Sequence, residues 1–579
     1  MKKDKSHIID IILIILDIIA LSWFSYTLFE ATTIPSKWRI IAFVIALLIT
    51  AILFVLSLYR ISGFKKWLHR FIALLLCAVL VVGSFYIGKI KSAINNITEI
   101  SDTSTIKISV IKLGTNTSIS SIDDLKGLKV AYQNGQDKDN AEYAKKKLSK
   151  AVSGINFVSD TSYVTMANSL SSNQIDAMII TESYLANVND SITDFSSTVS
   201  KIETYKRKIK NKSSANTEKD LTAHPFTMLL SGVDTSDDGE ASQRSDVNMI
   251  LIVNPVTNHL EMASIPRDSW IPNIALNSGN DKLTHTGNNG IENTIASIEN
   301  VVGFNIDYYV QVNFTSVVKI VDAIGGVEVN VPIDFCEQNS KRSFAAADEI
   351  CLKAGVQTLN GEQALALARH RHSYTDLQRT EAQQLVIKAM INKLLSSQGA
   401  TSVPSLLDIL PDYITTNVGS SQLNDFISYE LDHADAWSYG SVSLENGASA
   451  SLTTASMGST LLSCYLLNKA DIENLWYQYQ LIVKPVSFAK FKWNKQNLYS
   501  DLTPYNAPNG VYFYGDDVSA FAGTTLDTSS DVTQTTTQDT TTTDDQKTTE
   551  PTTPSEPVTP TDPTTPTDPT TPTEPTTGD

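Results

Sequence analysis

One stretch of sixteen residues, Arg369–Gln384, concentrates groups that bind anions. It holds three arginines and two histidines, in a chain whose formal net charge is −17. Arg369 and Arg371 stand two residues apart, so in an extended segment both side chains would leave the same face. Planar guanidinium groups suit the bidentate geometry of phosphate, and this spacing therefore favours a phosphate-binding pair.

A helix is expected directly after these arginines. Asp376 stands where a helix N-cap is expected, and apolar residues recur at helical spacing from Leu377 onward. On that helix Arg379 and Gln383 are four residues apart and share one face. Guanidinium groups that converge on a helix N-terminus form an anion site. The alternative is a solvated helix start whose charges are paired at the surface, and this stretch alone leaves both interpretations open.

Acids and arginines also recur at successive strand ends earlier in the chain. An apolar strand over 226–234 ends at Asp234, and Arg244 and Asp246 open the next strand. A third strand over 260–265 leads into Arg267 and Asp268. Functional residues of α/β folds gather where strands end and loops begin.

These residues suit phosphoryl transfer. Asp234 and Asp246 are hard oxygen ligands of the kind that hold Mg²⁺ together with substrate phosphates. Positive side chains could neutralise a pyrophosphate, and in phosphoryl transfer the metal and the cations do most of the work. The candidate cations are Arg244, Arg267, Arg369, Arg371 and Arg379. For any one residue a turn cap or a surface ion pair is a competitive explanation, but the recurrence at element ends favours a site.

Other catalytic signatures are weak or missing from the sequence. His370 and His372, two residues apart with no nearby third ligand, make a weak zinc signal, and His285 stands alone. The sequence has no Gly-rich phosphate loop of the Walker type and no Gly-x-Ser-x-Gly nucleophile elbow. The acidic soluble parts argue against nucleic-acid binding, which depends on clustered basic charge.

Three apolar runs near the N-terminus predict membrane spans. They cover 8–29, 40–59 and 71–90, each near the length of about 20 residues that a helix needs to cross a bilayer. Basic residues precede the first run and lie between the second and third, which predicts a cytoplasmic N-terminus and an outer location for everything after about residue 92. No small-residue cleavage site follows the first run, so it is interpreted as a retained anchor.

The fold class expected for the rest of the chain is α/β. Residues 1–95 are predicted to form three transmembrane helices and 100–215 a small α/β accessory domain. Residues 220–505 are predicted to form the main domain and 522–579 a disordered tail. Phrases at 124–131 and 174–180 resemble half of a periplasmic solute-binding fold. With no ligand-facing arginine or aromatic pair evident, a spacer or protein-interaction role is favoured over a solute receptor.

Two remaining features concern the cysteines and the tail. Cys336 and Cys351 flank a polar insertion and could form a disulfide on the outer side, or stay as two unpaired thiols. The segment from Thr525 to Asp579 contains eleven acidic residues and one basic residue, Lys547, so −10 of the net charge lies in this Thr- and Pro-rich tail. Such a composition cannot bury a core, and a solvated, extended spacer is expected, with glycosylation on threonine left open.

A set of ordered phrases recurs through the main region: Gly232-Val-Asp234, Arg244-Ser-Asp246, Pro266-Arg267-Asp268, Asp281-Lys282, Gly325-Gly326-Val327, Leu359-Asn-Gly-Glu-Gln-Ala-Leu365, Arg369-x-Arg371, Asp376-x-x-Arg379 and Gln383. These phrases resemble the LytR–CpsA–Psr family, the wall glycopolymer ligases of Gram-positive bacteria. The resemblance is strong from Phe226 to Leu395 and weaker to about Asp501. Three spans followed by a small α/β domain also resemble the streptococcal capsule-type members.

The resemblance implies an αβα domain with a central mixed sheet and a hydrophobic tunnel for a polyprenyl chain. Such enzymes transfer a glycopolymer, such as a capsular polysaccharide or teichoic acid, from undecaprenyl pyrophosphate to a peptidoglycan hydroxyl through a phosphodiester. Carried over, Asp234 and Asp246 would hold Mg²⁺ or Mn²⁺. The pyrophosphate would be bound by Arg244, Arg267, Lys282, Arg369, Arg371, Arg379 and Gln383.

The catalytic residues implied by the resemblance are Arg267 with Asp268 or Asp376, and either acid could orient arginines or assist deprotonation of the acceptor. Many members have Lys-Ile-Asn where this chain has Lys282-Leu283-Thr284, which keeps the lysine and puts the side-chain contact at position 284 in doubt. Two other functions remain open: a polyprenyl pyrophosphate phosphatase, and a non-catalytic regulatory or binding protein of the cell envelope.

Overall fold

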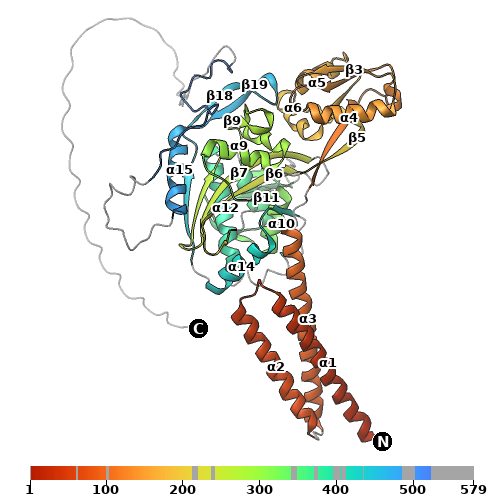
Figure 1. Ribbon diagram of the computed structural model, residues 1–579, viewed down its shortest axis with the longest axis vertical. Helices are drawn as coiled ribbons and strands as arrows, with labels where there is room; N and C mark the ends of the chain where they lie inside the picture. Colours follow the sequence, from red (N-terminus) through yellow and green to blue (C-terminus); the bar gives the residue numbers. More distant parts are fainter. Residues whose placement is uncertain are drawn as a thin grey trace, which may run out of the picture. The chain divides into compact units, whose positions relative to one another are not determined.

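The protein is described from a computed structural model, shown in Figure 1. It describes residues 2–59, 63–98, 103–210, 219–235, 241–340, 348–370, 376–395, 406, 413–433, 436–484 and 502–522. Within these ranges the side chains of 2–7, 97, 103–104, 209–210, 234–235, 241–243, 314, 376–380 and 395 are not described. The chain divides into two units, 1–528 and 529–579, and the predicted tail beyond Ala522 lies outside the described residues.

Three long helices open the chain, α1 (Lys2–Glu30), α2 (Ser36–Leu58) and α3 (Phe64–Thr98) (Figure 1). Each contains a stretch long and apolar enough to cross a membrane: Ile8–Glu30, Ser36–Leu58 and Phe64–Asn96. Large apolar side chains such as Ile19 and Leu48 stay exposed. Exposed apolar surface of this kind suits lipid as the surrounding solvent. The prediction of three membrane-spanning helices is confirmed in length and composition.

A charged residue inside the first span is paired across the bundle. Asp10 of α1 accepts a hydrogen bond from Arg70 Nε at 2.6 Å and lies 3.0 Å from Lys66 Nζ. Both partners belong to α3. A paired carboxylate costs far less in an apolar setting than an isolated one, so the acid is compatible with a span.

The first sheet contains β1 (Thr103–Leu113), β2 (Lys129–Gln133), β3 (Asn156–Asp160), β4 (Ala177–Thr181) and β5 (Val199–Lys210), in the order β3-β2-β4-β1-β5. Alternating strand residues bury two opposite faces, as the period of two requires. One face packs on α4 (Lys138–Ala151), and the other on α5 (Tyr163–Ser171) and α6 (Leu185–Ser191). The predicted alternation of strands and helices is therefore present here.

The main sheet has six strands in the order β16-β11-β6-β7-β8-β17. They are β6 (Phe226–Thr235), β7 (Ala241–Asn254), β8 (His259–Ser264), β11 (Tyr308–Asn313), β16 (Ile414–Thr416) and β17 (Ser438–Ser443). β11 runs parallel to β6 and β17 parallel to β8, while the other neighbouring pairs are antiparallel. The predicted central mixed sheet is confirmed.

Helices cover both faces of the main sheet. Leu229 and Ile250 point to the face covered by α9 (Ile291–Val302) and α15 (Lys469–Val483). Met228 and Met249 point to the opposite face, against α12 (Asp376–Leu395) and α14 (Ser420–His433). The result is the αβα layering that the sequence predicted. None of the side chains of α14 is fully buried, so this helix covers its face loosely.

Beside this sheet, α10 (Phe314–Ala323) and α11 (Gly361–Arg369) enclose a further apolar cluster with two hairpins. One hairpin pairs β12 (Val327–Val331) with β15 (Gly355–Leu359), and the other pairs β13 (Phe335–Gln338) with β14 (Glu349–Leu352). After α10 the chain turns through Gly325 and Gly326, whose φ angles of +76° and +86° favour glycine.

A further group of elements lies beside the segment that follows β8. They are β9 (Trp270–Asn273), β10 (Gly279–Lys282), the short helix α8 (Leu283–Thr286), and the hairpin of β18 (Ala448–Thr454) with β19 (Gly458–Leu466). Trp270 is buried and donates a hydrogen bond from Nε1 to Thr453 O at 3.0 Å. This contact ties the segment after β8 to the hairpin.

Candidate functional site

The strand register gathers the predicted residues at one end of the main sheet. In the antiparallel pair β7–β8, Met249 lies opposite Ser264, so Arg244 and Asp246 extend past the end of β8. In β6–β7, Gly232 lies opposite Val247, which brings the end of β6 to the same place. The chain beyond Ser264 continues directly into Arg267. The sequence predicted Arg244 and Asp246 at the start of a strand, but β7 begins at Ala241 and both residues lie within it. They lie beside the end of β6 and beyond the end of β8.

Backbone hydrogen bonds fix a second segment against the first. Thr284 N donates to Arg267 O at 2.8 Å, and Leu283 N donates to Ser269 O at 2.8 Å. The end of β10 and the start of α8 therefore lie beside the turn that follows β8. This arrangement places Lys282 next to Asp268.

One carboxylate oxygen connects the central residues. Asp246 Oδ1 accepts a hydrogen bond from Arg267 Nη1 at 2.9 Å and another from Thr284 Oγ1 at 3.0 Å. Thr284 Oγ1 in turn lies 3.4 Å from Arg244 Nε. Arg244, Asp246 and Arg267 are therefore joined in one network, with the Thr284 hydroxyl between them.

The charge of Arg267 is stabilised by its neighbours. Burial lowers the pKa of its guanidinium, but Asp246 and Asp268 outweigh that effect and raise the pKa above its usual value. Its Nε is buried and makes no hydrogen bond within the described part of the chain. Asp268 Oδ2 lies 3.7 Å from that atom.

Asp268 forms the more open side of the network. Its Oδ1 accepts a hydrogen bond from Lys282 Nζ at 3.1 Å, and its side chain is 36% exposed, against 11% for Lys282. A carboxylate that contacts both Lys282 and Arg267 can orient these two cations. Five of the predicted site residues are thus brought together: Arg244, Asp246, Arg267, Asp268 and Lys282.

A buried polar cluster supports the network on its inner side. His285 Nδ1 lies 2.7 Å from Asp281 Oδ1, and Ser456 Oγ donates to the same oxygen at 2.9 Å. Both His285 and Asp281 are almost fully buried. Burial lowers the pKa of His285, but the carboxylates of Asp281 and Asp190 outweigh it and raise the pKa. His285 is thus bound by carboxylates, and the short helix α8 positions its side chain.

The stretch that begins at Arg369 is described in part. Arg369 is the last residue of α11 and not part of an extended segment. Its Nη1 lies 3.4 Å from Asn339 O. His370 is buried, bound to Glu337 Oε2 at 3.0 Å and stacked on Phe335.

The helix after this stretch lies close to the site. α12 begins at Asp376, and Gln383 Nε2 donates to Ala368 O at 3.2 Å. Gln384 Nε2 lies 3.5 Å from Ser264 Oγ, at the end of β8. The first half of α12 is therefore beside the strand end that leads to Arg267.

Four predicted site residues cannot be placed at the level of their side chains. Arg371 lies outside the described residues altogether. The side chains of Asp234, Asp376 and Arg379 also lie outside them, although the backbone of Asp234 is in β6 and that of the other two in α12.

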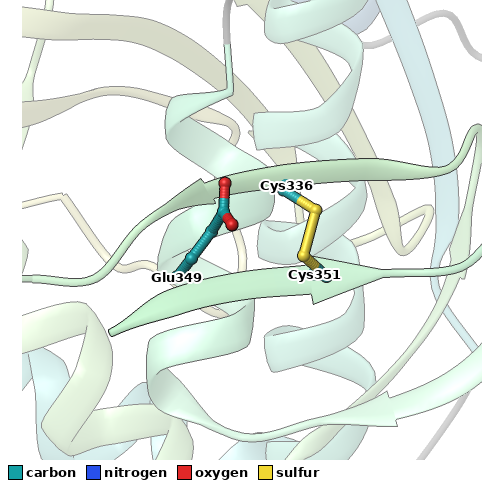
Figure 2. A group of neighbouring side chains, drawn as sticks. All are labelled: Cys336, Glu349 and Cys351. Carbon is teal, nitrogen blue, oxygen red and sulfur yellow. A yellow bond between two sulfur atoms is a disulfide. The ribbon is translucent and has the colours of Figure 1, made fainter. Parts of the chain in front are cut away.

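Among the described residues, one group of three has the residue types of a metal site: Cys336, Glu349 and Cys351 (Figure 2). The two cysteines are joined by a disulfide with an S–S distance of 2.05 Å. Disulfide sulfurs are not the thiolates that bind zinc. This group is therefore a cross-link beside an acid, and the sequence alternative of two unpaired thiols is wrong.

Three residues of the site were not predicted from the sequence as members. Thr284 was singled out only as a departure from the family pattern, yet its hydroxyl contacts both Arg244 and Asp246. Asp281 was noted in a motif without a role. Asp190 comes from α6, and its Oδ2 lies 3.0 Å from Arg244 Nη1. No local pattern marks Asp190, because only the tertiary fold brings it near Arg244.

Residues 191–477 match the model of the LytR_cpsA_psr family. The chain is 30% identical over 239 residues to TagU of Enterococcus faecalis, a polyisoprenyl-teichoic acid–peptidoglycan teichoic acid transferase, over 41% of this chain and 73% of that protein. It is 35% identical over 189 residues to TagT of Bacillus subtilis, which bears the same transferase name, over 32% of this chain and 56% of that protein.

Among solved structures, that of B. subtilis TagV aligns with 45% of this chain and 97% of that chain, at 24% identity and a TM-score of 0.38. The identification depends on the sequence relatives, because the match to TagU spans nearly three quarters of that protein at 30% identity. The family resemblance seen in the ordered phrases is thereby confirmed. The chain belongs to the LytR–CpsA–Psr family.

Proposed function

We propose that the protein is a membrane-anchored transferase that moves a glycopolymer from a polyprenyl pyrophosphate carrier to peptidoglycan. The observation that carries this proposal is the network around Arg267, in which two acids hold a charged guanidinium at the end of the main sheet. The relatives TagU and TagT are named for such a transfer with teichoic acid as the polymer. For this chain a teichoic acid or a capsular polysaccharide fits the same chemistry.

The cations of the site would neutralise the pyrophosphate. Arg244, Arg267 and Lys282 surround Asp246 and Asp268, and their positions support a role in binding the bridging and terminal oxygens. The same role is proposed for Arg369, Arg371, Arg379 and Gln383, because α12 lies beside the end of β8. Fixed cations placed where charge develops lower the barrier of phosphoryl transfer.

The one described ligand candidate, Asp246, fits a divalent cation. Asp246 uses Oδ1 for Arg267 and Thr284, while its Oδ2 makes no hydrogen bond with the residues that the structure describes. A side chain 11% exposed with one unengaged carboxylate oxygen can bind Mg²⁺ or Mn²⁺, which needs only one or two carboxylates beside substrate phosphates. Asp234 is proposed as the second ligand. When bound, the metal would polarise a phosphoryl oxygen and neutralise its charge.

The reaction replaces a phosphoanhydride bond by a phosphodiester bond. The acceptor hydroxyl oxygen forms a bond to the phosphorus that carries the glycan, and the bridging P–O bond of the pyrophosphate breaks. Polyprenyl phosphate leaves with that oxygen, and the glycan stays on the acceptor through a phosphodiester. The hydroxyl proton passes to a carboxylate, for which Asp268 and Asp376 are the candidates, and Arg267 stabilises the transferring group.

The loosely covered face of the main sheet would take the lipid. Leu423 and Phe426 of α14 and Ile387 of α12 meet Met228 and Leu230 of the sheet, and all five side chains are only partly buried. Apolar side chains that are partly accessible between two layers suit a polyprenyl chain. The lipid would then enter from the bilayer while its pyrophosphate reaches Arg267.

The proposed location is the cell membrane, with the N-terminus in the cytoplasm and the site outside, facing the cell wall. Basic residues at 2–5 and 60–70 support this orientation by the positive-inside rule. The disulfide supports it independently, since such bonds persist in oxidising compartments. We also propose the division into three spans (1–95), an accessory domain (100–215), a catalytic domain (220–505) and a tail (522–579).

The decisive experiment uses the full-length chain in lipid nanodiscs. It is given a polyprenyl-pyrophosphate-linked glycan and peptidoglycan oligomers, with and without Mg²⁺. Metal-dependent release of polyprenyl phosphate together with a glycan–peptidoglycan conjugate is expected. Release without a conjugate would indicate a phosphatase instead, and lipid binding with no turnover of varied glycans would indicate a binding or regulatory protein.

Replacing Arg267 tests the site directly. Arg267→Ala is expected to lower the transfer rate about 100- to 1000-fold, because it removes the central positive charge from the transition state. The control is Lys353→Ala, which removes an exposed ion pair with Asp334 at 2.8 Å outside the site. Full activity of the Arg267 variant, with the control also active, would refute the assignment.

A further inference from the structure

A carboxylate from outside the main sheet reaches one of the proposed pyrophosphate-binding arginines. Asp190 belongs to α6, which packs on the first sheet. Its two carboxylate oxygens lie 3.1 and 3.0 Å from Arg244 Nη1. The same nitrogen lies 3.4 Å from Ala186 O, one turn earlier on α6. A single helical turn therefore binds one edge of the guanidinium.

Neighbouring contacts show that this meeting point is a polar interface. Asn288 Nδ2 donates to Asn187 Oδ1 at 3.1 Å, and Tyr184 OH lies 3.5 Å from Asn289 Oδ1. His285 Nε2 lies 3.6 Å from Asp190 Oδ2. The segment from Tyr184 to Asp190 thus rests on the segment that follows Thr284, immediately behind the site.

The charges at this contact are shielded from water. The side chain of Arg244 is 9% exposed and that of Asp190 is 29% exposed. Burial raises the pKa of Asp190, but His285 and Arg244 outweigh it and lower the pKa to about 2. Asp190 is therefore ionised at neutral pH. A shielded guanidinium requires such a counter-charge, because an unpaired buried charge is strongly unfavourable.

We propose that Asp190 is a positioning residue for Arg244, supplied to the transfer site by the region of the first sheet. With Asp190 on Nη1 and Thr284 on Nε, the plane of the guanidinium is fixed before substrate binds. A cation held in its working orientation loses less entropy on binding pyrophosphate. The inference rests on the proposed function of Arg244, and it gives the first sheet a role that the sequence did not reveal.

The test compares isosteric variants in the full-length chain in nanodiscs. Asp190→Asn keeps the shape of the side chain and removes its charge, whereas Asp190→Glu keeps the charge. Asp190→Ser is a second neutral variant, to be used if the Asp190→Asn protein fails to fold. The matched control is Asp194→Asn. Asp194 is exposed and lies four residues after Asp190, and asparagine tolerates its left-handed backbone conformation. We expect kcat/KM for the lipid-linked glycan to fall about 10- to 100-fold in the neutral variants. The control should match the unmodified protein, and Asp190→Glu should recover part of the rate.

A double variant separates positioning from general structural support. If Asp190 acts through Arg244, then adding Asp190→Asn to Arg244→Ala lowers kcat/KM no further than Arg244→Ala alone. A further loss of similar size in that background would overturn the proposal. So would an unchanged kcat/KM in Asp190→Asn, or a raised one, since a raised rate would mean that Asp190 competes with the substrate.

Binding of inorganic pyrophosphate, measured by calorimetry on the same preparations, keeps this inference distinct from the transferase proposal. Weaker pyrophosphate binding by the Asp190→Asn variant supports the positioning role of Asp190 even if the unmodified protein transfers no glycan. A lack of transfer by the unmodified protein would refute only the transferase proposal. Equal binding by both proteins would overturn the role of Asp190. Normal glycan transfer by the Asp190→Asn variant would also overturn the role of Asp190, but it would leave the transferase proposal standing.

Discussion

At the scale of single residues, the site depends on groups that share partners. Asp246 Oδ1 serves both Arg267 and Thr284, so the position of each cation depends on a neighbour. Such groups act together, and replacing a supporting residue should affect the rate almost as a direct contact would. Thr284 and His285 are the clearest supporting residues in the described part of the site.

Thr284→Val removes the hydroxyl and keeps the shape of the side chain. Asp246 then loses one donor and Arg244 Nε loses one acceptor, so transfer is expected to fall about 10- to 100-fold. Steady-state transfer assays would measure the change. Thr284→Ser retains the hydroxyl and should stay near the unmodified rate, and equal activity of all three proteins would contradict the role given to Thr284.

His285 should make stability depend on pH. Burial lowers its pKa, but Asp281 and Asp190 outweigh this and raise it above the ordinary value of 6.5. A raised pKa means that the charged form is favoured in the folded state. The stabilisation of the folded state by charged His285 is therefore complete below pH 6.5 and is lost as the pH rises through the folded-state pKa. The Tm difference between the unmodified protein and His285→Gln should shrink as the pH is raised, and a difference that grows would contradict this.

The sequence could identify the residue types of the site but not all of their partners. Arg244, Asp246, Arg267 and Asp268 were predicted because functional residues of α/β folds gather where strands end and loops begin. Asp190 could not be predicted, because it lies 54 residues before Arg244 and on a helix of the other sheet. Pairings over such distances depend on how elements dock, and local patterns carry no information about docking.

At the scale of elements, one family phrase proves to be structural. In Leu359–Leu365, Asn360 caps α11 together with Gln363, and Leu359, Ala364 and Leu365 are buried. Gly361 N donates to Asp322 Oδ1 at 2.7 Å, close against α10. This phrase therefore sets where α11 begins, and hence where Arg369 lies at its end.

Gly361→Ala should disturb that placement. An added Cβ would lie 2.2 Å from Val318 O, a backbone atom that cannot move aside without shifting α10. We expect a loss of about 1–3 kcal/mol in the free energy of unfolding, together with slower transfer. Chemical denaturation would measure the first. Gly88→Ala in α3 is the control, since nothing lies within 4 Å of its added Cβ, and an equal loss in both variants would contradict the explanation.

Helices and strands with strong periodicity were predicted well, and their neighbours were not. The strands at 226–234 and 260–265 and the helix from Leu377 onward follow from regular apolar spacing, which local sequence determines. The edge strands β16 and β17 were missed. β16 has three residues and β17 has six, mostly small or polar, so neither carries an alternating apolar signal. Edge strands are defined by the sheet that they join.

At the scale of the whole molecule, an apolar helical bundle and a disulfide occur in one chain. The helices suit a bilayer, and the cross-link between Cys336 and Cys351 suits an oxidising compartment. On β13 the cysteine points outward, while Phe335 and Glu337 point inward to His370. The cross-link therefore closes a hairpin whose inner face holds the residue next to Arg369.

Replacing both cysteines by serine should lower stability. The disulfide spans 15 residues, and closing a loop of that length is worth about 3 kcal/mol in the chain-entropy model. Urea denaturation without reductant would measure the loss. Reductant should lower the stability of the unmodified protein by the same amount and should not change that of the double variant. An equal loss in both proteins would contradict the disulfide as the cause.

The same cross-link affects how the protein is made. The chain is synthesised in the cytoplasm, where thiols stay reduced, so in the proposed orientation Cys336 and Cys351 can be joined only after they have crossed the membrane. Recombinant protein from a reducing cytoplasm would lack the bond and carry a loosened hairpin beside His370. Expression through a secretory route is therefore the appropriate source of material for crystallisation and assays.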